Sequence, residues 1–120
     1  MNFNSVILVG HLTRDPELRH VNENNMAIAK AAIAVSRKYK DSKSTCFVDI
    51  VAFGKIAELM KEYCHKGSNI LIQGRLVQNI WEQDGQKRSK HEVHIDTFQL
   101  GKKGESTENE PKDESDDTPF

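Results

Sequence analysis

Long apolar runs are missing from this 120-residue chain, and cysteine is scarce. No stretch approaches the roughly 20 apolar residues that cross a bilayer, and no positive charge precedes the short apolar stretch near the start. We therefore expect neither a membrane span nor a secretory signal. Two cysteines, Cys46 and Cys64, are too few for a disulfide scaffold and are not spaced as a zinc knuckle. The composition predicts a cytoplasmic protein with two reduced, packed thiols.

Patterns for catalysis and metal binding are absent as well. No glycine-rich phosphate loop of the Walker type occurs. His91 and His94 are three residues apart, which in a strand places them on opposite faces, so they do not predict a metal site. Asp15, Glu17 and Asp49 are the acidic residues that a nuclease could recruit, but they come from separate segments without a ligand pattern. We expect no enzymatic activity, no metal and no cofactor.

The charges are unevenly divided along the chain. Residues 1–104 contain 16 Lys and Arg against 11 Asp and Glu, a net charge of +5, whereas residues 105–120 contain one against seven, a net charge of −6. A basic body joined to an acidic segment indicates a polyanionic ligand. Residues 101–120 are also too polar to build a core, so we expect a folded domain at residues 1–100 and a disordered acidic tail at residues 101–120.

Alternation of apolar and polar residues predicts several strands, and one segment predicts a helix. In residues 55–65 the apolar residues recur at helical spacing, and Lys66-Gly67 supplies a stop. Asp84-Gly85 is a strong hairpin signal. The predicted strands span residues 2–12, 26–39, 45–53, 69–82 and 91–100. Five strands with a helix between the third and fourth is the order of an OB-fold, so we expect an all-β protein with one helix, built as a five-stranded Greek-key barrel.

Two of the predicted strands place aromatic side chains on a polar face. In residues 45–53, Phe47 and Phe53 share a face with Asp49, because successive side chains of a strand alternate. Trp81, the only tryptophan, falls on the polar face of its own strand. Phe3 and Tyr63, by contrast, are expected in the core. The residues predicted to point inward are Val48, Ile50, Ala52, Ile70, Ile72, Gly74, Leu76, Val93 and Ile95.

Basic and aromatic residues are interleaved in this sequence. Single strands expose both charged phosphates and unstacked base faces, so a protein that binds them combines cations with aromatic platforms. Tyr39 follows Arg37 and Lys38, and Trp81 shares a predicted face with Arg75. The alternative is that the aromatics are ordinary core and the lysines a solvated surface. The polar neighbours on the same faces argue against burial, because burying them would cost free energy.

Six short motifs occur along the chain in a fixed order. They are Val-Ile-Leu-Val-Gly at 6–10, Asp-Pro-Glu at 15–17, Phe-Gly-Lys at 53–55, Ala-Glu at 57–58, Lys-Gly-Ser at 66–68 and Gly-Arg-Leu at 74–76. By their order and spacing they resemble the motifs of bacterial single-stranded DNA-binding proteins. The resemblance spans about residues 3–100 and implies an OB-fold that binds single-stranded DNA during replication, recombination and repair. It also implies a homotetramer, paired partly through the first strand, in the cytoplasm and on the nucleoid.

The resemblance assigns roles to individual residues. Two of the aromatic positions depart from the family pattern, since Tyr39 and Phe47 stand where tryptophan is common. Residues 77–80 also lack the basic residues that often precede the last aromatic. We add Arg75 to the phosphate contacts from its outward position beside Trp81. The implied stacking residues are Tyr39, Phe47, Phe53 and Trp81, and the implied phosphate contacts are Arg19, Lys40, Lys55, Lys66 and Arg88.

The acidic segment resembles the partner-binding tip of the same family. Asp116 and Asp117 precede Pro119 and Phe120, with Thr118 where a hydrophobic residue is common. The resemblance implies that proteins of replication, recombination and repair bind here. The alternative is a generic acidic tail that only improves solubility. Two other classes stay open for the barrel itself, an RNA-binding OB module and an adaptor for small ligands or proteins.

Overall fold

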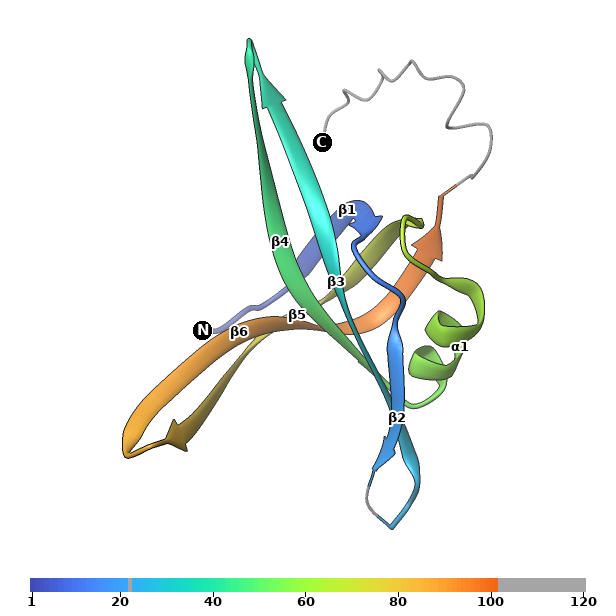
Figure 1. The fold of residues 1–120 in the computed structure, drawn as a ribbon, viewed down its shortest axis with the longest axis vertical. Helices are drawn as coiled ribbons and strands as arrows, with labels where there is room; N and C mark the ends of the chain where they lie inside the picture. The colour runs from blue at the N-terminus through green and yellow to red at the C-terminus, as the bar shows by residue number, and fades with distance from the viewer. Residues whose placement is uncertain (22, 102–120) are drawn as a thin grey trace.

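Six strands and one helix make up the computed structural model, which describes residues 1–21 and 23–101. In the described residues, no helix has the length and apolar character that crossing a membrane requires. Figure 1 shows the helix beside one end of a curved sheet. The elements are β1 (Val6–Leu12), β2 (Glu17–Val21), β3 (Met26–Tyr39), β4 (Ser42–Phe53), α1 (Lys55–Tyr63), β5 (Asn69–Gln83) and β6 (Gln86–Leu100).

The sheet closes into a barrel. Its strand order is β1-β5-β6-β4-β3-β2, and a further pairing of β1 with β3 joins the ends of a five-stranded ring. All neighbours are antiparallel except β4 and β6, which run parallel because α1 and β5 lie between them in the chain. β2 is an additional strand that pairs with the first half of β3. This arrangement confirms the predicted OB-fold.

Alternate side chains of the strands fill the barrel, and α1 covers it. Ile33, Ile50, Ile70, Ile72 and Val93 are fully buried at the centre. Burial of this apolar surface is the main term that stabilises the fold, at roughly 25 cal/mol per Å². The helix packs against β3 and β4, and its buried residues occupy successive turns of its inner face. The buried residues of α1 are Ala57 and Met60, and Cys64 at its C-terminal cap is buried with them.

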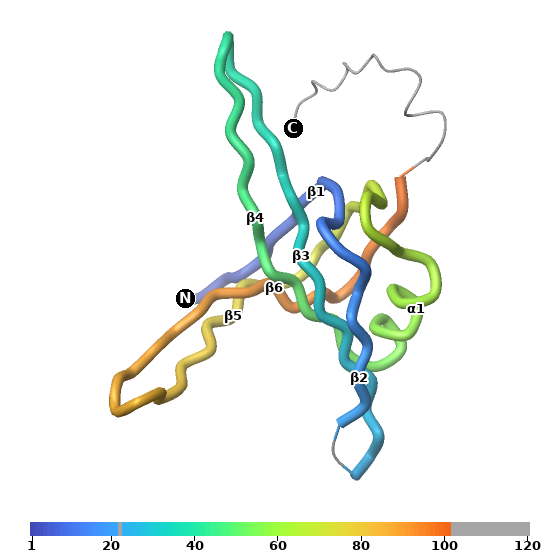
Figure 2. The backbone as a smooth tube through the Cα atoms, in the orientation of Figure 1, coloured from blue at the N-terminus to red at the C-terminus, as the bar shows by residue number. Residues whose placement is uncertain are grey.

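Two β-hairpin arms extend beyond the barrel (Figures 1 and 2). In residues 36–47 of β3 and β4, and in residues 78–91 of β5 and β6, every residue is exposed. We call these segments the β3–β4 arm and the β5–β6 arm. The second arm ends in the predicted Asp84-Gly85 turn, where both residues have positive φ angles of 54° and 78°, as a tight hairpin turn between twisted strands requires.

Some boundaries and faces differ from the sequence predictions. The strand β2 was not predicted, and β4 and β6 begin at Ser42 and Gln86 instead of at residues 45 and 91. These added residues lie in the polar arms, where backbone pairing extends the strands without apolar alternation. Leu76 was predicted to point inward but is exposed. It lies where β5 leaves the barrel, and the Asn4 side chain bonds to its backbone N–H and C=O there, at 2.9 and 2.8 Å.

Three further predictions of burial were wrong. Phe3 precedes β1 and is exposed, and Tyr63 ends α1 with its ring in solvent. Cys46 is exposed because it lies on the β3–β4 arm, whereas Cys64 is buried as expected. Burial raises the pKa of the Cys64 thiol. Two of the errors share a cause, since Phe3 and Cys46 lie beyond the segments of the chain that pack on the barrel, and Tyr63 lies at the exposed end of α1.

Candidate nucleic-acid interface

Backbone register joins β2, β3 and β4 into one outward surface. Phe47, Asp49 and Phe53 occupy alternate positions on β4, opposite in direction to the core residues of that strand. Residues directly opposite each other in a ladder point the same way. Ile28 of β3 lies opposite Phe53, and Arg19 of β2 lies opposite Ile28. The surface therefore runs from the Phe53 ring to the Arg19 guanidinium.

The same surface continues through β6 to β5. His94 lies opposite Val51 of β4, and Arg75 lies opposite His94. Farther along the β5–β6 arm, Arg88 lies opposite Trp81. Because 75 and 81 differ by an even number along β5, Arg75 and Trp81 share the face. We call the outward positions of β2, β3, β4, β6 and β5 the outer face.

The aromatic residues predicted to stack on bases are accessible to solvent. The exposed fractions are 69% for Phe47, 38% for Phe53, 42% for Trp81 and 63% for Tyr39. None of these four rings is ordinary barrel core, so that part of the alternative interpretation is wrong. Exposing large apolar rings costs free energy in water. Exposed rings that share a face, as Phe47, Phe53 and Trp81 do, are typical of a binding site.

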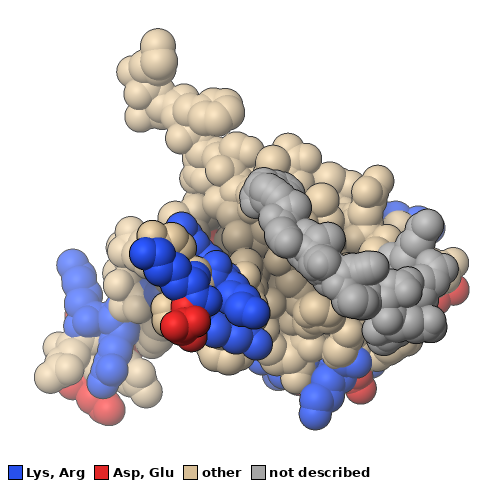
Figure 3. All heavy atoms as spheres, turned by 90° about the horizontal axis from the view of Figure 1, so that it is seen from above, with Lys and Arg blue, Asp and Glu red and all other residues tan. Residues whose placement is uncertain are grey.

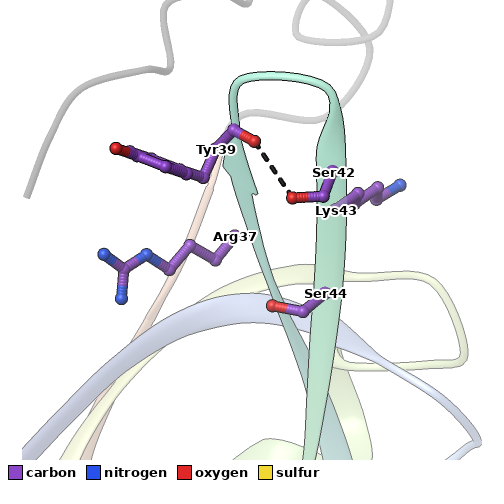
Figure 4. A pocket seen from close by; sticks show the side chains of 5 residues that line it. All are labelled: Arg37, Tyr39, Ser42, Lys43 and Ser44. Carbon is purple, nitrogen blue, oxygen red and sulfur yellow. Dashed lines mark hydrogen bonds between the residues drawn. The ribbon is translucent and has the colours of Figure 1, made fainter.

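Tyr39 lies on the other side of the β3–β4 arm. Ser42 is its ladder partner and Ser44 is the partner of Arg37, whereas Phe47 pairs with Ala34 in the alternate set. Figure 4 shows Tyr39 and Arg37 on one side of the hairpin, lining a hollow. The Ser42 hydroxyl donates a hydrogen bond to the Tyr39 carbonyl at 3.1 Å, and the Lys40 ammonium lies 5.4 Å from the centre of the Tyr39 ring. The four predicted platforms thus lie on two surfaces.

Phe53 is held in place by a series of side-chain contacts that runs through His94 and Glu92 to Asn79. Its ring meets the His94 ring edge to face, with 5.1 Å between the centroids. His94 Nε2 lies 2.9 Å from a carboxylate oxygen of Glu92, and the Asn79 amide donates to the same oxygen at 2.8 Å. This series of contacts connects β4, β6 and β5. It therefore fixes the relative positions of Phe53 and the base of the β5–β6 arm.

Glu92 is the buried charge of this network, with 8% of its surface exposed. Burial raises the pKa of its carboxyl, but hydrogen bonds from His94 and Asn79 and electrostatic interactions with His94 and Lys90 lower it more. The pKa of Glu92 consequently lies below its ordinary value, and the group is a carboxylate at neutral pH. A paired carboxylate in this position stabilises the outer face without presenting free negative charge.

Cations and carboxylates form pairs across the outer face. Lys90 Nζ lies 3.0 Å from an oxygen of Asp49, and Arg75 and Asp96 are 3.5 Å apart. Arg19 and Glu17 are 3.8 Å apart. Arg75 and Arg19 were candidates from the sequence, but Lys90 was not. Its alternation with Arg88 on the same strand was the signal that could have identified it.

The remaining predicted cations are spread over the molecule. Lys40 lies at the tip of the β3–β4 arm, and Lys55 begins α1 two residues after Phe53. Lys66 lies in a separate loop, where its backbone N–H donates to the Asp15 carboxylate at 2.7 Å. That contact gives Asp15 a structural role. Figure 3 shows Lys and Arg side chains gathered where the arms project, with a few acidic side chains among them.

Two further predictions, of no metal site and of a partner-binding tip, do not concern the outer face. In residues 1–21 and 23–101, no three His, Cys, Asp or Glu side chains are grouped to hold a metal ion. The predicted partner-binding residues Asp116, Asp117, Pro119 and Phe120 lie outside the described residues.

Comparison with known proteins places this chain in a family. The Single-strand binding protein family matches residues 3–101. A single-stranded DNA-binding protein of Wolinella succinogenes is 48% identical over 104 residues, which cover 82% of this chain and 64% of that protein. Proteins with the same name from Helicobacter hepaticus and Treponema pallidum are 39% and 38% identical, over 61% and 57% of their lengths. The chain spans about three fifths of the length of these relatives, and it belongs to the Single-strand binding protein family.

Proposed function

We propose that the outer face binds single-stranded DNA without sequence preference and without altering it chemically. The observation that carries the proposal is that three accessible rings, Phe47, Phe53 and Trp81, occupy outward positions of the same face as the cations Arg75, Arg88 and Lys90. Bases stack on aromatic rings whatever their identity, and cations neutralise phosphates of any sequence. The names of the relatives support the same ligand.

Individual roles follow from position. Phe47, Phe53 and Trp81 offer stacking platforms on the outer face, and Tyr39 offers a fourth on the opposite side of its arm. Arg19, Arg75 and Arg88 lie beside the outer-face platforms and contact phosphates. Lys40, Lys55 and Lys66 lie at the arm tip and around α1, where they would contact a longer strand that continues past the outer face.

A titration with oligo(dT) tests the proposal. Trp81 is the only tryptophan, so its fluorescence should be quenched as bases stack on it, and affinity should fall with salt by a log–log slope of about −0.7 per phosphate neutralised. Duplex DNA of the same length should bind more weakly, because pairing conceals the base faces. Equal binding to duplex would refute the proposal. Tighter binding to oligo(U) would favour the RNA-binding alternative.

We also propose that the protein acts as a homotetramer. β1 pairs with β5 from Val6 to His11, but with β3 only at His11 and Leu12. In the described structure, its other edge from Val6 to Gly10 therefore lacks a strand neighbour, and Ile7 and Val9 are exposed beside it. A free edge next to apolar side chains favours pairing with a second copy. Sedimentation that yields only the monomer mass, with and without oligo(dT), would contradict this.

The acidic residues 101–120 complete the proposal as a tail that recruits proteins of replication, recombination and repair. Phe120 is the only large apolar residue there, so it would supply most of the binding energy for a partner pocket. Asp116, Asp117 and Pro119 would add charge and shape. Phe120→Ala should release partners in a pull-down from a bacterial lysate while leaving oligo(dT) affinity unchanged. Recovery of the same partners would return residues 101–120 to a solubility role.

A further inference from the structure

We infer that Asp49 is a built-in competitor for phosphate on the outer face, which occupies Lys90 in the free protein and thereby lowers DNA affinity at low salt. This inference rests on the proposed function and concerns how that surface is regulated. It starts from the position of Asp49, which alternates on β4 between Phe47 and Phe53. A carboxylate is thus held in the row of rings along which a DNA backbone would run.

The ion pair lies where the two arms meet. Lys90 Nζ on β6 is 3.0 Å from Oδ2 of Asp49 on β4. Asn79 is the ladder partner of Lys90, and the next outward pair along the β5–β6 arm is Trp81 with Arg88. Lys90 therefore stands between the rings of β4 and the ring of Trp81, which is a position for a phosphate contact.

A phosphate can replace Asp49 as the partner of Lys90, because this ion pair is exposed to solvent. The side chains of Lys90 and Asp49 are 46% and 42% exposed, so separating them leaves no buried charge and costs little free energy. Glu92 on the same face differs, since it is buried and bonded to His94 and Asn79. Of these two carboxylates, only Asp49 can turn away to admit a phosphate oxygen.

Replacement of Asp49 by a phosphate oxygen beside Lys90 changes how DNA affinity depends on salt. A phosphate that meets a free lysine releases its condensed counterion, which drives binding at low salt. A phosphate that displaces Asp49 also releases a counterion, but the freed carboxylate gathers a cation from solution and offsets the release. Lys90 should therefore add almost nothing to the salt slope of the natural protein. Removing the Asp49 charge should restore the full contribution of Lys90 to the salt slope.

The decisive variant is Asp49→Asn, measured with oligo(dT) at 50 and 200 mM NaCl. It should bind about two- to fivefold more tightly at 50 mM, as expected for the loss of one exposed competing pair. Its log–log slope should be more negative by about 0.7, so the gain should shrink about 2.6-fold by 200 mM. Asp49→Ser should behave alike, and thermal unfolding of both variants verifies that they are folded.

Two controls distinguish competition by Asp49 from a general effect of net charge on DNA affinity. Glu58→Gln on the exposed side of α1 changes the net charge equally and should leave the slope unchanged. In a Lys90→Gln background, Asp49→Asn should give no further gain. If Asp49→Asn matches Glu58→Gln, or if its gain persists without Lys90, the inference is overturned while DNA binding stands. If the natural protein fails to bind oligo(dT), the proposed function itself is wrong.

Discussion

The barrel and its two arms use the same strands but are held by different forces. In the barrel, each strand buries alternate side chains such as Ile33 and Ile72, and apolar burial dominates. In residues 36–47 and 78–91 every residue is exposed, so the backbone ladders and the turns hold the arms together. The side chains of the arms therefore contribute little to stability, and three of the exposed rings, Tyr39, Phe47 and Trp81, lie there.

The largest expected effect tests the barrel side of this comparison. Ile33→Ala removes a fully buried side chain and should lower the free energy of unfolding by about 2–5 kcal/mol, because a cavity is added to the lost transfer energy. Oligo(dT) affinity of the folded protein should stay unchanged. Urea unfolding and a titration measure the two quantities. A large loss of affinity in folded Ile33→Ala would blur the division between barrel and arms.

The next effect tests the arm side. Trp81→Ala should weaken oligo(dT) binding by about 1–3 kcal/mol per stacked base, while the free energy of unfolding changes by no more than about 0.5 kcal/mol, as for an exposed site. Tyr63→Ala is the matched control, since Tyr63 is an exposed ring on α1, which contributes no residue to the outer face as defined above. Equal losses of affinity in both variants would show that the outer face has no special role.

Glu92 lies where the barrel meets the β5–β6 arm, and its substitution should have the smallest effect of the three. The pKa of Glu92 is lowered in the folded protein, so its ionised form stabilises the fold above its ordinary pKa of 4.5, and this contribution disappears as pH falls through the lowered value. Natural protein and Glu92→Gln should therefore differ in Tm near neutral pH and converge in acid. A difference that stays constant from pH 7 to pH 3 would contradict the assignment.

Strand alternation, the helical spacing of residues 55–65 and the turn signals predicted the fold, and alternation also predicted the faces of three aromatic rings. Phe47, Phe53 and Trp81 were placed correctly on a polar face because a period of two fixes which way each side chain points. Lys90 and the position of Tyr39 were missed, since both depend on how strands pair with each other and not on order within one strand. Register sets the partners across a sheet. Leu76 was misplaced because strand alternation continues past the point where the barrel stops, and Tyr63 because helical periodicity continues to the exposed end of α1.

The twist of the two arms affects which kind of nucleic acid can follow their rings. Two-stranded ribbons twist more strongly than wide sheets, so the rings along them point in progressively different directions instead of forming a flat track. A ligand that stacks on Phe53, Phe47 and Trp81 in turn has to bend and rotate over a few nucleotides. Duplex DNA resists such bending, with a persistence length of about 50 nm. Under the proposed function, the surface therefore selects single strands by their flexibility as well as by their exposed bases.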